Sequence, residues 1–233
     1  MQKSKATVIT LKYAVAIDGP AGAGKSSIAK ELSRKLGFIY VDTGALYRTV
    51  ALYLLNNGIK ADEVDKIAEA LEKIDVSLEH KEDGQHVFLC GEDVSALIRT
   101  EPVSMMASTT SALPIVRKFL FDLQVQMAEK YNVIMDGRDI GTVVLPNAQV
   151  KIFLTASPED RAERRMLEYK AKGIEADYEK ILEDIKKRDY QDMNRATSPL
   201  KKADDAVLLD TTGNEFHQSV EQMLEIITSK ISL

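Results

Sequence analysis

Short apolar runs alternate with longer amphipathic stretches along most of the chain. The runs have the length and composition of buried strands, and polar or turn-forming residues bound them. They lie at residues 13–18, 38–42, 132–136, 150–155 and 206–210. Helical patterns fill most of the intervals. This alternation predicts an α/β fold with a five-stranded parallel sheet that helices cover on both faces.

The alternation breaks between about residues 61 and 101. Two strand-like segments, 71–80 and 86–90, flank the polar run Lys81-Glu82-Asp83-Gly84-Gln85. This pattern predicts a small antiparallel β hairpin inserted into the α/β scheme. We therefore predict one domain over residues 13–233, with an insert over about 61–101.

Composition and charge narrow the class of protein. The 233 residues are 45% hydrophobic and 29% charged, as in globular enzymes, and no apolar run reaches the ~18 residues of a membrane span. Residues 1–12 are polar and lack the apolar centre of a signal peptide, so we predict an N-terminal extension. Cys90 is the only cysteine, which excludes an internal disulfide and fits a reducing compartment. We expect a cytoplasmic monomer.

The net charge of −5 argues against a broad nucleic-acid footprint. We therefore expect neither a nucleic-acid polymer nor a membrane as partner. An acidic chain that binds phosphates must gather its arginines locally.

A glycine-rich run matches the pattern G-x-x-x-x-G-K-[ST] where its chemistry requires it, after the first strand and before a helix. In that setting the loop N–H groups converge on one anion, Lys25 reaches terminal phosphates, and the Ser26 hydroxyl can bind Mg²⁺. A dinucleotide-binding pattern fails because Ser27 stands where its third glycine belongs. We predict a P-loop for a nucleoside triphosphate, made of Gly19, Pro20, Ala21, Gly22, Ala23, Gly24, Lys25, Ser26 and Ser27.

Polar residues end the strand at 132–136. Asp136 follows an apolar run, as does the carboxylate that holds Mg²⁺ in P-loop proteins, and Gly137-Arg138-Asp139 come next. Many buried strands end in Asp, but the P-loop beside this one favours a site. Ser26 and Asp136 are the predicted metal ligands.

The second strand is also followed by candidate ligands. The run from Asp42 to Arg48 opens a helix and brings the Thr43 hydroxyl and the Arg48 guanidinium to the same sheet edge. Beside a P-loop, an anion clamp is favoured over a surface arginine.

Charged residues extend the buried face of a helix that starts near Asp177. Ile181 and Ile185 are four residues apart, and steps of three and four continue their stripe to Arg188, Asp192 and Arg195. Charge on a helix usually marks a solvated face. Here the charges prolong the apolar stripe, so a cleft lined with arginine is favoured.

A second basic cluster contains Arg161, Arg164 and Arg165, spaced i, i+3, i+4 after a helix start at Ser157-Pro158. It is either a solvated face paired with neighbouring acids or a lid, over about residues 157–176, that brings guanidinium groups over a phosphate.

Several runs together resemble the bacterial cytidylate (CMP) kinase family of P-loop nucleoside monophosphate kinases, and the resemblance covers nearly the whole chain after residue 12. Its most specific parts are the Gly-Arg-Asp-Ile-Gly-Thr-Val-Val run and the inserted hairpin. The matching runs are residues 17–26, 42–48, 91–95, 98–100, 136–144, 150–154, 188–189 and 194–195.

This resemblance implies that ATP, with Mg²⁺, phosphorylates CMP and dCMP. By position, Thr43, Arg48 and Arg138 hold the CMP phosphate; Ser108, Arg117 and Asp139 read cytosine; Arg188 and Asp192 contact ribose; and Arg195 bridges the phosphates. Thr43 stands where many relatives have Ser, and the hydroxyl is retained. The implied catalytic residues are Lys25, Arg138, Arg188 and Arg195, and the lid residues implied at ATP are Arg161 and Arg165.

Other readings compete with this one. A small GTPase requires an Asn-Lys-x-Asp motif, and the chain contains no Asn-Lys pair. A P-loop kinase of a small metabolite would use the same arginines to clamp a carboxylate. A non-catalytic nucleotide sensor would have no use for the complete set of predicted phosphate-binding and metal-binding residues.

Overall fold

The main sheet has five parallel strands in the order β2-β6-β1-β7-β8. The computed structural model describes residues 12–81, 84–171 and 173–232. Each strand matches one of the predicted apolar runs to within a residue at either end, so the predicted α/β fold is confirmed. The strands are β1 (Ala14–Asp18), β2 (Ile39–Asp42), β6 (Val133–Gly137), β7 (Val150–Thr155) and β8 (Val207–Asp210).

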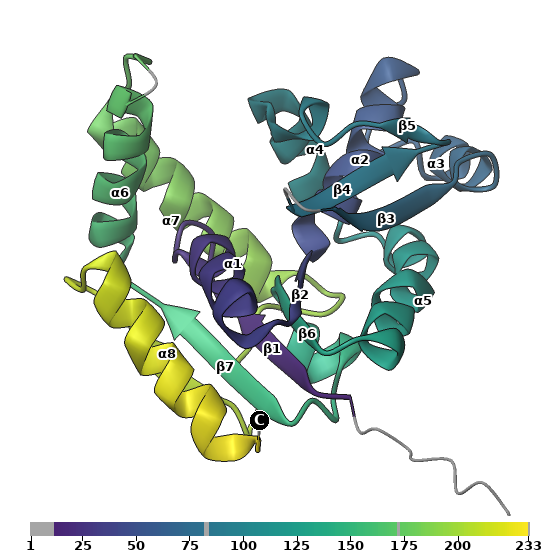
Figure 1. The fold of residues 1–233 in the computed structure, drawn as a ribbon. Coiled ribbons are helices and arrows are strands. Elements are labelled where there is room, and N and C mark those ends of the chain that lie inside the picture. The colour runs from purple at the N-terminus through teal and green to yellow at the C-terminus, as the bar shows by residue number, and fades with distance from the viewer. Residues whose placement is uncertain (1–11, 82–83, 172, 233) are drawn as a thin grey trace, which may run out of the picture.

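Helices fill most of the intervals between the strands, as Figure 1 shows. Across the described residues, no helix is both long and apolar enough to cross a membrane. The predicted N-terminal extension lies outside the described residues except for Lys12. The helices are α1 (Lys25–Leu36), α2 (Thr43–Asn56), α3 (Val64–Leu71), α4 (Glu101–Thr110), α5 (Pro114–Lys130), α6 (Pro158–Ala171), α7 (Tyr178–Asn194) and α8 (Phe216–Lys230), with a 3-10 turn η1 (Leu97–Arg99) and a π-helical turn η2 (Ile140–Val144).

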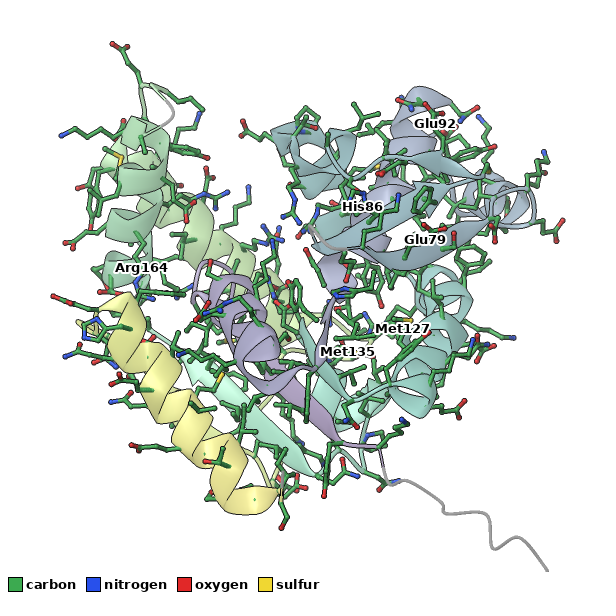
Figure 2. The ribbon with its side chains drawn as sticks, viewed as in Figure 1. Glu79, His86, Glu92, Met127, Met135 and Arg164 are labelled. Atoms are coloured by element: carbon green, nitrogen blue, oxygen red, sulfur yellow. The ribbon has the colours of Figure 1, made fainter. Side chains whose placement is uncertain are left out.

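Alternate residues of each central strand face opposite layers. Val15 and Ile17 of β1 pack in one cluster with residues of α1 and α8. Ala16 packs in another cluster, which contains residues of α5 and η2. Figure 2 labels two members of this second cluster, Met127 of α5 and Met135 of β6. Because both faces are covered, the strands are apolar throughout, which is why they appear in the sequence as continuous runs.

The predicted hairpin is present and belongs to a second, three-stranded antiparallel sheet, β3-β4-β5. Strand β3 (Val76–Lys81) pairs with β4 (Gly84–Leu89), and β4 pairs with the two-residue strand β5 (Glu92–Asp93). Residues 82–83, at the predicted turn, lie outside the described residues. No local pattern predicts β5, since two exposed acidic residues have no strand pattern.

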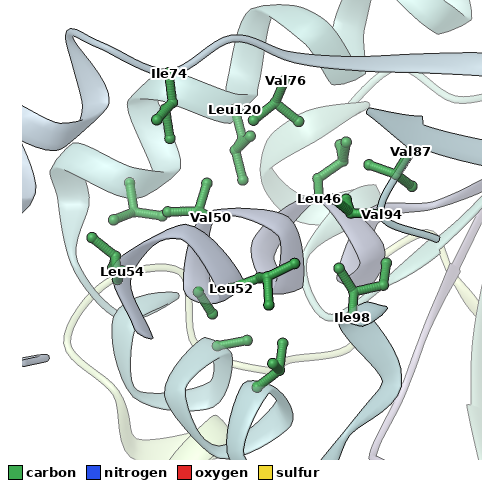
Figure 3. Close-up of a cluster of buried hydrophobic side chains, with 14 of the residues drawn as sticks. Leu46, Val50, Leu52, Leu54, Ile74, Val76, Val87, Val94, Ile98 and Leu120 are labelled. Carbon is green, nitrogen blue, oxygen red and sulfur yellow. The ribbon is translucent and has the colours of Figure 1, made fainter. Parts of the chain in front are cut away.

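A hydrophobic cluster fixes this sheet to α2 (Figure 3). Leu46 and Val50 of α2 are fully buried in it, together with Val87 of β4, Ile98 of η1 and Leu120 of α5. Gln85 of β4 also accepts a hydrogen bond of 2.8 Å from the backbone N–H of Asp42, which ends β2. The insert is therefore held against the carboxyl edge of the main sheet.

Candidate active site

The P-loop connects β1 to α1, as predicted. A Cβ atom on Gly19 would lie 1.9 Å from the carbonyl oxygen of Leu154, so only glycine fits against β7 there. Gly22 and Gly24 have φ angles of +77° and +87°, which side chains other than hydrogen rarely allow. The Lys25 ammonium is buried and donates a 2.7 Å hydrogen bond to the Pro20 carbonyl. The loop thus turns into the positive end of α1.

The two predicted metal ligands lie together. Ser26 Oγ donates to Asp136 Oδ2 over 2.9 Å, and the Tyr40 hydroxyl donates to Oδ1 over 2.8 Å. Burial and the nearby Asp42 raise the pKa of Asp136. No cluster of three or more His, Cys, Asp or Glu that could hold a metal occurs within the described ranges. One hydroxyl and one carboxylate fit Mg²⁺, which takes its other ligands from phosphates and water.

A cleft of about 340 Å³ opens beside this pair. Eight arginines and one lysine line it, against five carboxylates, so the acidic chain has gathered a local excess of positive charge. Figure 1 shows α6 and α7 on one side of the sheet edge and the β3-β4-β5 sheet with α4 on the other. The predicted site residues in the lining are Ala21, Gly22, Lys25, Ser26, Thr43, Arg48, Ser108, Arg117, Asp136, Arg138, Asp139, Arg161, Arg165, Arg188, Asp192 and Arg195.

Two of these arginines each form an ion pair with a carboxylate through one edge of the guanidinium group. Arg138 Nε donates to Asp192 Oδ2 over 2.8 Å, and Arg48 Nη2 donates to Asp42 Oδ2 over 2.9 Å. Burial by itself raises the pKa of Asp192, but Arg138 and Arg188 hold that pKa below its ordinary value. These two pairs orient the guanidinium groups without using all of their donors.

Other arginine donors in the cleft are buried without a hydrogen-bond partner in the described part of the chain, although Arg195 Nη2 forms an ion pair with Asp139 Oδ1 over 3.6 Å. Arg48 Nε, Arg188 Nε and Arg195 Nη2 have no hydrogen-bond partner among the described residues. Burial, reinforced by Arg138, lowers the pKa of Arg188 to about 10, and burial together with Arg117 lowers that of Arg195. An unpaired buried donor costs ~1–3 kcal/mol. Polar or anionic ligand groups in the cleft would supply the missing acceptors, and negative charge there would favour the charged forms of Arg188 and Arg195.

Arg117 is tightly held at another part of the lining. It donates to the Asp139 carboxylate, to Ser198 Oγ over 3.1 Å and to the Ser111 carbonyl over 3.1 Å. Its guanidinium also lies 5.5 Å from the centre of the Tyr47 ring. These contacts hold the Arg117 guanidinium beside the Asp139 carboxylate. Such a pair suits a ligand that both donates and accepts hydrogen bonds.

Some predicted site residues have partners within the protein or lie outside the lining. The Thr43 hydroxyl donates to the Asp136 carbonyl over 2.8 Å. Arg161 is 2% exposed, which excludes a solvated position for this member of the basic cluster. The P-loop residues outside the lining of the cleft are Gly19, Pro20, Ala23, Gly24 and Ser27.

The lining also contains residues that were given no individual ligand role: Asp42, Gly44, Tyr47, Ser104, Ala107, Ser111, Gly137, Arg164 and Glu168. Arg164 belongs to the predicted basic cluster, Asp42 ends a predicted strand at the site, and Tyr47 adjoins the predicted site residue Arg48. The serines of α4 had no such signal, since nothing local distinguishes them from an exposed helix face.

Asp18 joins the P-loop strand to the turn after β6. Its carboxylate is 4% exposed and accepts hydrogen bonds of 2.7 Å from the N–H groups of both Ile140 and Gly141. That turn carries Arg138 and Asp139. Burial outweighs the two hydrogen bonds and raises the pKa of Asp18 to about 6.

The P-loop, the hydrogen-bonded pair of Ser26 and Asp136 and the opposing arginines define the class: this is a P-loop kinase. Comparison with known proteins then gives the family. The model of the cytidylate kinase family matches residues 15–229, and the chain belongs to that family. The alternatives of a GTPase and a small-metabolite kinase are not favoured.

Similar proteins agree with this assignment. A cytidylate kinase of Carboxydothermus hydrogenoformans is 50% identical over 216 residues, which cover 93% of this chain and 97% of the relative. One of Caldanaerobacter subterraneus subsp. tengcongensis is 51% identical over 220 residues, 94% of this chain and 96% of the relative. A crystal structure of an uncharacterized protein from Eubacterium ventriosum has a TM-score of 0.53 at 14% identity, covering 94% of this chain and 99% of that one, and shows likeness of fold alone.

The raised pKa of Asp18 predicts a pH-dependent difference between the wild type and Asp18→Asn. From about pH 4 to pH 6 the folded wild type binds more protons than the unfolded chain, so it loses stability relative to the variant as the pH rises. The shift corresponds to about 3 kcal/mol in the difference between their free energies of unfolding. Urea titrations at several pH values measure this difference, and a difference constant over pH 4–7 contradicts the prediction.

Proposed function

We propose that this chain transfers the γ-phosphoryl group of ATP directly to CMP and forms ADP and CDP. The observation that carries the proposal is the set of buried N–H groups of Arg48, Arg188 and Arg195 that lack a hydrogen-bond partner among the described residues, in the cleft beside the P-loop lysine. A triphosphate bound at the P-loop leaves these arginine N–H groups available for a second, phosphate-containing ligand. A nucleoside monophosphate is such a ligand.

The P-loop and Lys25 form the donor half. The loop N–H groups and the start of α1 bind the triphosphate, while the Lys25 ammonium, freed from the Pro20 carbonyl, turns to its terminal phosphates. Ser26 and Asp136 hold Mg²⁺ with the nucleotide, where the ion neutralises phosphate charge. Arg165 of α6 approaches this half from the lid side.

The acceptor half uses the start of α2 and the arginines opposite. Thr43 and the free donors of Arg48 and Arg138 bind the CMP phosphate at the positive end of that helix. Arg188 and Asp192 contact the ribose. Arg195 reaches between the two phosphates and stabilises the charge on the transferring group.

No general base is required for this reaction. The second pKa of a phosphate monoester is ~6, so at neutral pH CMP is largely a dianion that attacks without losing a proton. Catalysis then consists of aligning two polyanions and neutralising their charge. Lys25 and the arginines of the cleft supply this charge.

The pair Arg117 and Asp139 suits cytosine. The exocyclic amino group of cytosine donates a hydrogen bond, and its ring nitrogen and carbonyl accept. Asp139 accepts from the amino group, while Arg117 and Ser108 donate to the acceptors. Uracil would present a carbonyl oxygen to Asp139 and leave two acceptors facing each other.

We extend the proposal to dCMP as acceptor and to a monomer acting in the cytoplasm. The cleft of a single chain already holds residues for both the donor and the acceptor half. The single free cysteine is compatible with a reducing compartment.

Replacing the P-loop lysine tests the reaction. With ATP, Mg²⁺ and CMP, the wild type is expected to form CDP, and Lys25→Met to lower kcat by roughly 100-fold or more, because a charge-stabilising group is lost. Lys35→Met on the exposed side of α1 is the control and keeps wild-type kcat. Near-normal turnover of Lys25→Met, or a wild type inactive towards CMP, contradicts the proposal.

Replacing the carboxylate that faces the base tests the recognition of cytosine. Asp139→Asn is expected to lower the ratio of kcat/KM for CMP to that for UMP by roughly 5- to 100-fold, because the amide can donate to uracil. Asp122→Asn, on the exposed face of α5, is the control and leaves the ratio unchanged. Initial rates with CMP and with UMP at saturating ATP measure this ratio. An unchanged ratio in Asp139→Asn contradicts the role of Asp139 in recognising cytosine.

A further inference from the structure

Arg161, at the start of α6, is bound on several sides by the protein itself. Its Nε donates to the Ala156 carbonyl over 2.9 Å and its Nη1 to the Ala21 carbonyl over 3.0 Å. Nη1 and Nη2 also donate to the two oxygens of Asp189, over 3.0 and 2.6 Å. The side chain is 3% exposed. Four of the five N–H groups of a guanidinium are thereby used.

This arrangement leaves Arg161 without the pair of free N–H groups that a phosphate clamp uses. It differs from Arg188 and Arg195, which have buried donors without partners in the described part of the chain. Arg161 therefore cannot clamp ATP without giving up at least one of its hydrogen bonds to Ala156, Ala21 or Asp189.

The contacts of Arg161 connect three elements of the site. Ala21 belongs to the P-loop, and a Cβ atom on Gly22 would lie 3.5 Å from the Cβ of Arg161. Asp189 belongs to α7 and directly follows Arg188, whose guanidinium lines the cleft. A shift of the ion pair would thus move the donor loop and the charged face of α7 relative to each other.

We propose that Arg161 and Asp189 act together as positioning residues that set the distance between the P-loop and Arg188 of α7. The proposal rests on the proposed kinase function. Removing one partner leaves the other as an unpaired buried charge, whereas removing both does not. The two residues should therefore act as one unit on nucleotide binding and turnover.

A double-mutant cycle tests this proposal with Arg161→Met, Asp189→Leu and the double variant. ATP affinity is measured by calorimetry, and kcat and KM for each substrate by initial rates, well below each unfolding midpoint. Each single variant is expected to lower kcat/KM for ATP by roughly 10- to 100-fold, since small misplacements in a site cost this much. The double variant should be no worse than the worse single variant.

The matched control is the exposed pair Lys186 and Glu159, which joins α7 to α6 over 3.1 Å with both side chains more than half exposed. Lys186→Met and Glu159→Gln should change neither kcat nor KM. Arg161→Lys, which keeps the charge but not the paired donors, should recover part of the loss in Arg161→Met. If a hydrophobic replacement does not fold, Asp189→Asn and Arg161→Gln provide the cycle instead.

Two results overturn the proposal. If Arg161→Met raises KM for ATP while Asp189→Leu leaves it unchanged, Arg161 binds ATP directly. If the effects of the single variants multiply in the double variant, the pair is not a unit. Failure of the proposed function has a different result: the wild type binds ATP in the calorimeter but does not phosphorylate CMP. In that case the double-mutant cycle on ATP affinity still tests whether Arg161 and Asp189 position the P-loop.

Discussion

Several arginines share one cleft, and each must stay charged while most of its surface is removed from water. Carboxylates make this possible. Asp42 and Asp192 each bind one side of a guanidinium, that of Arg48 and of Arg138, and leave other donors unpaired. A fully paired arginine would be stable but unable to bind phosphate, and an unpaired buried one would be costly. The cleft lies between these limits, with a local excess of positive charge in a chain whose net charge is −5.

The fold brings these charges together because parallel strands end at one edge. Strand β6 lies between β1 and β2, so Asp136 pairs in register with Ile17 on one side and Asp42 on the other. The P-loop, the metal pair and the start of α2 are therefore neighbours. The insert fixes α2 through its hydrophobic cluster, and Arg188 of α7 and Arg195 just after it supply guanidinium groups from the opposite side. Donor and acceptor phosphates would thus meet without a large rearrangement of the sheet.

Much of this arrangement could be predicted from local patterns. Strands buried on both faces are continuous apolar runs, and the stripe from Ile185 to Arg188 and Asp192 follows helical spacing. The order of the strands was not predictable, since it depends on pairing between distant segments. Neither was the burial of Arg161, because spacing along α6 identifies a face but cannot reveal that Asp189 of another helix covers it. The roles of individual site residues remain predictions, since they depend on bound substrates.

Direct transfer between two phosphates in one cleft has a stereochemical consequence. ATP made chiral at its γ-phosphorus with oxygen isotopes can be incubated with CMP, and the configuration of the transferred group in CDP determined. A single in-line displacement inverts the configuration at phosphorus, and inversion is the predicted result. Retention would require a second transfer through a phosphorylated side chain and would contradict a cleft that works by alignment and charge neutralisation alone.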